Sequence, residues 1–163
     1  MKTKRLTRMA LLTAIALTIF IVEAQIPPLA PIPGIKLGLA NIITVYAMFA
    51  FGWKDTLMIL LCRIVLGNLA TGQFVSFLYS LCGGMACFTV MLLLRRLFTA
   101  EQIWICSILG SAAHVLGQMG AALVLTGTVS ILFYLPLLLV GAILTGLFTG
   151  LCAQFVLHRF PKQ

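Results

Sequence analysis

Two polar residues in a short glycine-containing segment of an apolar chain are the first indication of chemistry. The segment Pro33–Asn41, with the sequence Pro-Gly-Ile-Lys-Leu-Gly-Leu-Ala-Asn, places the cation Lys36 and the carboxamide of Asn41 between two long apolar stretches. An ammonium group and an amide can both bind a polar or anionic molecule, and the two glycines allow the backbone to approach it closely. We therefore expect Lys36 and Asn41 to belong to a small-molecule binding site at a membrane boundary.

Arg63 is a basic residue inside an apolar run, and Asn68 follows it five residues later. An ionisable side chain within a bilayer costs about 3 kcal/mol or more and usually faces a cavity or a partner. The guanidinium fork suits a carboxylate or a phosphate. Two interpretations remain open at Arg63: it binds a ligand, or it snorkels or pairs with Glu23 and holds two helices together.

His114 and Gln118 are four residues apart, so they share one face of a predicted helix. They either contact a ligand or lie in a close helix contact where His114 is only hydrogen-bonded. Glu23 is a partner for Arg63, a partner for Lys36, or a solvated residue. The residues predicted to bind substrate are Lys36, Asn41, Arg63, Asn68, His114 and Gln118.

The composition shows which elements must position these residues. Of the 163 residues, 62% are hydrophobic and 9% are charged, and the mean hydropathy is +1.16, which indicates an integral membrane protein. A spanning helix needs about 20 mostly apolar residues, so the chain has room for about six. We predict an all-α membrane protein with a single domain, 1–163, and about six transmembrane helices. The predicted helices are Leu6–Ile26, Leu37–Trp53, Thr56–Ala70, Phe74–Leu94, Gln102–Leu125 and Ile131–Leu157.

The second and third predicted helices are short and meet at Trp53-Lys54-Asp55. A re-entrant pair is therefore the alternative to two tilted spans. Cytoplasmic loops retain basic residues, which predicts a multi-pass protein of the plasma membrane with both termini in the cytoplasm. The formal charge of +8 is then explained by topology and contacts with anionic membrane lipid, and nucleic acid is not an expected partner. This orientation puts nine basic residues inside: Lys2, Lys4, Arg5, Arg8, Lys54, Arg95, Arg96, Arg159 and Lys162.

Proline and small residues suggest two further features. The connection Ile26–Gly34 contains four prolines, which make it stiff and non-helical, so it is either a lid over the pocket or an ordinary turn. Small residues four apart mark close helix contacts, and they occur as Ala10 with Ala14 and as Gly146 with Gly150. One pair could serve an internal contact and the other a partner subunit.

Several functional classes lack their motifs. There is no Gly-x-x-x-x-Gly-Lys-Ser/Thr loop for ATP, and three acidic residues cannot provide clustered carboxylates for Mg²⁺ and a diphosphate. The five cysteines have no metal-ligand spacing and are interpreted as packing residues. We therefore expect no enzyme activity, no metal site and no cofactor.

The layout of six helices, the Ala10-x-x-x-Ala14 pair and the segment Pro33–Asn41 resemble the substrate-binding S components of energy-coupling factor (ECF) transporters. More narrowly, the chain resembles the Gx transporter family, which is also labelled heptaprenyl diphosphate synthase component I. The similarity extends over nearly the whole chain, and Pro33–Asn41 and Arg63–Asn68 are its most distinctive parts.

This resemblance implies an ECF S-component-like bundle that captures a vitamin or precursor from outside. It also implies that Ala10 and Ala14 dock on a transmembrane coupling subunit driven by two ATPase subunits, and that the S component topples in the membrane to carry its pocket inward. The synthase label implies the alternative, a noncatalytic membrane component associated with the synthesis of heptaprenyl diphosphate.

Overall fold

The computed structural model describes residues 2–26, 35–72 and 74–159 of the chain. Within these residues the structure is all-helical, with six α-helices and no strand, which confirms the predicted fold class. The α-helices are α1 (Lys2–Glu23), α2 (Asn41–Ala50), α3 (Trp53–Thr71), α4 (Phe74–Leu94), α5 (Ile103–Thr126) and α6 (Leu135–Arg159), and two short 3₁₀ helices are η1 (Ala100–Gln102) and η2 (Val129–Tyr134).

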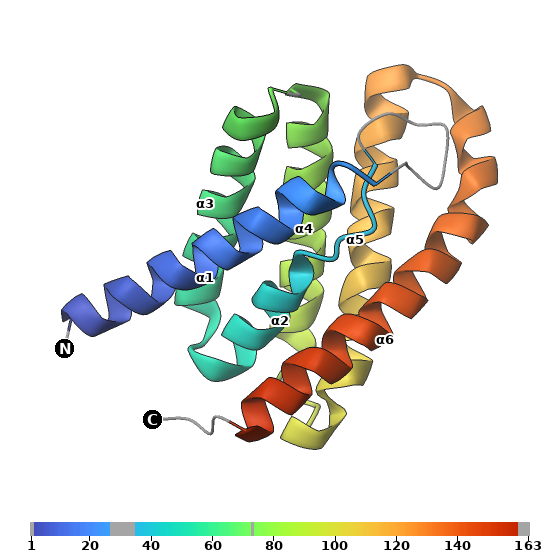
Figure 1. Cartoon of the computed structure of the whole chain (residues 1–163). Helices are drawn as coiled ribbons and strands as arrows, with labels where there is room; N and C mark the ends of the chain where they lie inside the picture. Colours follow the sequence, from blue (N-terminus) through green and yellow to red (C-terminus); the bar gives the residue numbers. More distant parts are fainter. Residues whose placement is uncertain (1, 27–34, 73, 160–163) are drawn as a thin grey trace.

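The helices form one bundle in which α4, α5 and α6 make the most extensive contacts (Figure 1). α3 packs against α4, α1 crosses over α3, and α2 lies between α3 and α6. Four helical segments are long and apolar enough to span a membrane: Thr3–Glu23, Phe74–Leu94, Ile103–Thr126 and Val129–Arg159. Their outward faces carry large apolar side chains, such as Phe133 and Val124, as lipid-facing surfaces do. The protein is therefore membrane-embedded.

The bundle has two chemically different ends. At one end, which we call the basic end, α1, α3 and α5 begin and α2, α4 and α6 finish (Figure 1). Its described contacts include an ion pair between Arg5 of α1 and Asp55 of α3, and Arg95 lies 3.8 Å from the sulfur of Met48. The opposite end, the connection end, contains the last turn of α1 and the segment Ile35–Ala40. The helix ends that carry the basic residues are thus grouped at one end of the bundle, as the sequence predicts. Which end faces the cytoplasm stays a prediction.

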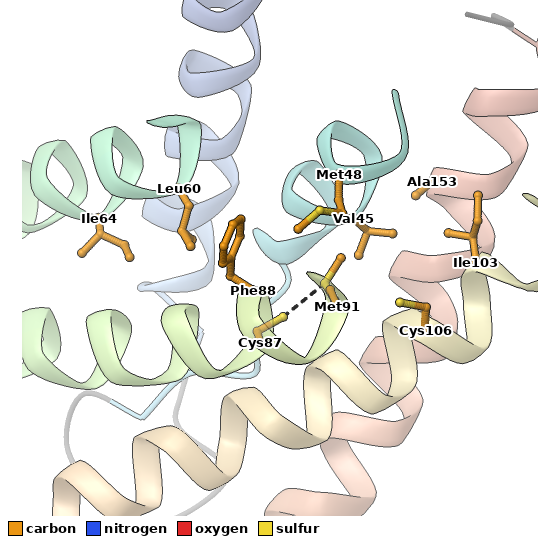
Figure 2. Close-up of a cluster of buried hydrophobic side chains, with 10 residues drawn as sticks. All are labelled: Val45, Met48, Leu60, Ile64, Cys87, Phe88, Met91, Ile103, Cys106 and Ala153. Carbon is orange, nitrogen blue, oxygen red and sulfur yellow. Dashed lines mark hydrogen bonds between the residues drawn. The ribbon is translucent and has the colours of Figure 1, made fainter. Parts of the chain in front are cut away.

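The main hydrophobic core lies between α2, α3, α4, α5 and α6 (Figure 2). Side chains from these helices converge there, including Met48, Ile64, Phe88 and Met91. Cys87 and Cys106 are buried in the same cluster, as expected of packing residues, whereas Cys62 and Cys82 are exposed. Met48 and Met91 lie near the ends of α2 and α4, and Ile103 begins α5, so this core packs the half of the bundle nearer the basic end.

The second helix differs most from its predicted range of 37–53. α2 contains only 10 residues, Asn41–Ala50, so it is about 15 Å long and too short to cross a bilayer. Residues 35–38 are non-helical, because Gly38 has φ +83° and its amide bonds a side chain instead of the backbone. Gly52, with φ +97°, ends the turn after α2 and lets α3 begin at Trp53.

The start of the sixth predicted helix also differs, because residues 129–134 form the 3₁₀ helix η2 before α6 begins at Leu135. The proline-rich connection, including Pro27, Pro28, Pro31 and Pro33, lies outside the described residues, as do Lys162 and Gln163. The expectation that this connection forms a lid therefore stays a prediction.

Candidate binding site

The connection end is organised around Gly38. Its amide donates a hydrogen bond to Oε1 of Glu23, at 2.5 Å, so the carboxylate at the end of α1 anchors the segment before α2. The positive φ of Gly38 is strained for any other residue. A methyl group at this position would also lie 2.8 Å from Nδ2 of Asn41 and 3.1 Å from the ring of His114. Glycine therefore lets the backbone pass between α2 and α5.

Lys36 lies in the same segment, two residues earlier. Its Nζ is buried 3.4 Å above the centre of the Phe20 ring, a cation–π contact with α1. Burial lowers the pKa of Lys36 to about 8; the nearby carboxylate of Glu23 opposes this change, and the positive charge of Arg63 adds to it. Lys36 therefore lies close to Glu23 and Arg63, and its ammonium group packs on the Phe20 ring instead of forming an ion pair.

Arg63 is 3% exposed and lies midway along α3. Glu23 and Arg63 are both described, and they form no ion pair within 4.0 Å; the ion pair of α3 joins Arg5 and Asp55 instead. One turn after Arg63, Gly67 gives space to the Phe20 ring, which lies where a side chain would be. Arg63 thus lies near Lys36 and Glu23, but its guanidinium group is not paired with the carboxylate of Glu23.

His114 and Gln118 form a hydrogen-bonded pair on α5, with 2.9 Å between Nε2 of His114 and Nε2 of Gln118. Oε1 of Gln118 accepts a hydrogen bond from the backbone N–H of Lys36 at 3.4 Å. This orients the amide so that its N–H donates to His114, whose Nε2 must then be the acceptor of a neutral imidazole. His114 and Gln118 therefore hold the Lys36 segment against α5, and no described contact yet requires a ligand there.

Several buried polar atoms at this end have no hydrogen-bond partner among the described residues. Most buried polar groups in proteins are bonded, and an unbonded one costs about 1–3 kcal/mol. Asn68 of α3, the one predicted site residue not yet described, has its Oδ1 among these unpartnered atoms. The unpartnered atoms are Nζ of Lys36, both side-chain polar atoms of Asn41, Nε of Arg63, Oδ1 of Asn68, Oγ of Ser76 and Nδ1 of His114.

The contacts above thus place four predicted residues, Lys36, Asn41, His114 and Gln118, around one segment. Arg63 joins them through its charge interactions with Lys36, Glu23 and His114. No described contact joins Asn68 to the other five. The sequence interpretation missed Phe20 and Ser76, although a single hydroxyl in the run Phe74-Val75-Ser76-Phe77 was a visible signal. Among the described residues, no group of three His, Cys, Asp or Glu side chains is arranged to hold a metal ion.

The two small-residue pairs have different surroundings. Gly146 and Gly150 are buried against α5: a methyl group at Gly150 would lie 2.6 Å from Cα of Trp104. Ala10 and Ala14 are exposed on α1. They line a groove of about 390 Å³ between α1 and α3, together with Met58, Cys62 and Leu66 among others. The glycine pair therefore serves an internal contact, and the alanine pair is open to a neighbour.

Comparison with known proteins adds one finding. A family model described as heptaprenyl diphosphate synthase component I matches residues 12–156, which is most of the chain. No curated protein and no solved structure matches. The matched range contains every residue of the candidate site.

Proposed function

The chain belongs to the heptaprenyl diphosphate synthase component I family, and we propose that it is the substrate-binding membrane component of an ECF-type uptake transporter. In this role it captures a small anionic or polar molecule from outside and docks on an ATP-driven coupling module. The substrate-binding residues of the proposal are Lys36, Asn41, Arg63, Asn68, His114 and Gln118.

The observation that carries this proposal is the group of unpartnered buried polar atoms at the connection end. A membrane protein that needed these groups only for stability would bond them to one another, because each unbonded group is costly in a low-dielectric interior. Here Gln118 and Nε2 of His114 are bonded to each other, while Nδ1 of His114 and the side chains of Lys36, Asn41 and Arg63 keep free donors and acceptors. Such free groups support binding of a polar molecule.

The exposed face of α1 supports the docking part of the proposal. Ala10 and Ala14 are small, exposed and adjacent to a groove, so another helix can approach the backbone closely there. Outward-facing Leu11 and Ile15 flank them with apolar surface. We propose a transmembrane coupling subunit as the partner, with ATPase subunits attached to it.

The variant Ala14→Trp tests this docking. The bulky ring fills the groove, so the coupling and ATPase subunits are expected to be lost from the purified complex while the isolated chain stays folded. Leu144→Trp is a matched control, because Leu144 is an exposed residue on α6, away from the groove. Equal recovery of the partner subunits with Ala14→Trp and with the parent would contradict the docking proposal.

The family description favours a second candidate function, a noncatalytic membrane component associated with the synthesis of heptaprenyl diphosphate. A noncatalytic role agrees with the acidic residues: Asp55 pairs with Arg5, and Glu23 accepts the amide of Gly38, so two of the three acids are engaged. Co-purification separates the candidates. Recovery of a soluble prenyltransferase instead of ATPase subunits would favour this second function.

A further inference from the structure

The charges at the connection end can be counted from its contacts. Lys36 and Arg63 contribute two cations, and Glu23 contributes one carboxylate that already accepts the Gly38 amide. From α5, His114 accepts a hydrogen bond on Nε2 and is neutral, and Cys87 of α4 is a buried thiol beside Arg63. These groups leave a single net positive charge, and it is buried.

From this charge balance and the free groups at Asn41, we infer that the site takes a monoanion, a small molecule with one carboxylate and an uncharged amide or ring N–H group. The inference rests on the proposed function and names its substrate class. The carboxylate is placed with Nζ of Lys36 and Nε of Arg63. The uncharged group is placed with Asn41, whose side chain offers one unpartnered donor group and one unpartnered acceptor.

Electrostatics selects the charge of the ligand. The cost of removing an ion from water grows with the square of its charge, whereas its attraction to a fixed net charge grows only linearly. A monoanion neutralises the single positive charge. A diphosphate carries more charge than the site can balance, and no metal-binding carboxylate cluster is present among the described residues to compensate. The site therefore prefers a carboxylate to a diphosphate.

The experiment compares acetate, which carries the carboxylate alone, with pyrophosphate, which is the diphosphate alone. The detergent-purified full chain is titrated at pH 7 with acetate and with pyrophosphate, at constant ionic strength set with chloride, and its melting temperature is recorded. Acetate is expected to raise the melting temperature above the chloride baseline, and pyrophosphate is not. Pyrophosphate stabilising more than acetate, or acetate having no effect beyond chloride, overturns the inference.

Variants of the site residues show whether acetate binds at the connection end. Lys36→Met and Arg63→Gln are each expected to raise the dissociation constant of acetate at least tenfold. Arg96→Gln, an exposed position at the basic end, should leave it unchanged. Because Lys36 is in a non-helical segment, Lys36→Met keeps the test valid even where Arg63→Gln fails to fold. Acetate binding that is unchanged in a folded Lys36→Met protein overturns the inference.

The pH dependence gives a second readout. Lys36 faces Glu23 and Arg63, and its pKa of about 8 means that it loses its proton above that pH. Acetate binding should therefore weaken by up to about tenfold per pH unit above pH 8. In Lys36→Arg, which stays protonated, binding should persist to higher pH. A pH profile that is the same for both proteins overturns the assignment of Lys36.

The acetate titration can succeed or fail independently of the transport role. The titration uses the isolated chain, whereas docking is measured by co-purification. Acetate binding without coupling subunits would keep the monoanion site and reject the transporter, and the reverse result would reject only the monoanion site.

Discussion

The interface between α5 and α6 and the connection end both place polar groups inside a membrane protein, but they use them differently. Between α5 and α6, Ser107 bonds Thr149 at 3.1 Å, and Thr149 also bonds the carbonyl of Thr145. At the connection end, Asn41 and Ser76 are just as buried, and their side chains have no partner among the described residues. Bonded polar groups hold helices together, whereas unbonded ones are available to a ligand.

The largest effect is expected at the α5–α6 interface. Gly150→Ala adds a methyl group 2.6 Å from Cα of Trp104, where the backbone itself must move. We expect a loss of about 1–3 kcal/mol in the free energy of unfolding, measured by reversible denaturation in detergent micelles.

Gly120 provides the matched control for this substitution. It lies on the exposed face of α5, and a methyl group there meets nothing within 4 Å. Gly120→Ala is therefore expected to be neutral or to stabilise by up to about 1 kcal/mol, because alanine favours the helix. If both variants unfold alike, the close contact does not hold α6 in place.

A pair of serine substitutions sharpens the comparison. Ser107→Ala removes a hydrogen bond to Thr149, so it should cost about 0.5–1.5 kcal/mol of stability. Ser76→Ala removes a buried hydroxyl that has no partner in the described structure, so it should be neutral or stabilising. Both free energies come from the same denaturation experiment. A larger cost for Ser76→Ala would mean that the hydroxyl is bonded within the protein.

The sequence predicted much of this arrangement, because long apolar runs and isolated charges are local signals. The predicted range Phe74–Leu94 is that of α4, and Arg63 and Lys36 stood out as cations away from the other basic residues. The short α2 was not predictable, since Leu37, Leu39 and Ala40 are apolar like the helix that follows. What stops the helix is tertiary: the Gly38 amide bonds Glu23, which is 15 residues away.

The site itself was predictable only as a set of residue types. No local pattern indicates that Glu23 bonds a backbone amide instead of Arg63, or that Phe20 of α1 lies beneath Lys36. Ser76 was missed for a related reason. Serine is common in membrane helices, and only the packing around it shows that its hydroxyl has no partner.

A pH-dependent effect concerns Lys36. Its pKa in the folded protein, about 8, is below the ordinary value of 10.5, so the unfolded chain binds more protons between these pH values. Stability should therefore rise from pH 8 to pH 10.5 relative to Lys36→Met, which lacks the group. The difference between the two proteins in apparent melting temperature measures it. A difference that is constant over this range would show that the ammonium group is solvated.

The most direct measurement of the central claim is native mass spectrometry of the detergent-purified chain, comparing the parent with Arg63→Gln and with Arg96→Gln. The account predicts a retained small anion in the parent and in Arg96→Gln. Arg63→Gln should lose it, since a missing charge-assisted hydrogen bond weakens binding by roughly 1.5–3 kcal/mol. The same small molecule retained equally by a folded Arg63→Gln protein, or only lipid adducts in all three proteins, would contradict the claim that the connection end is a binding site.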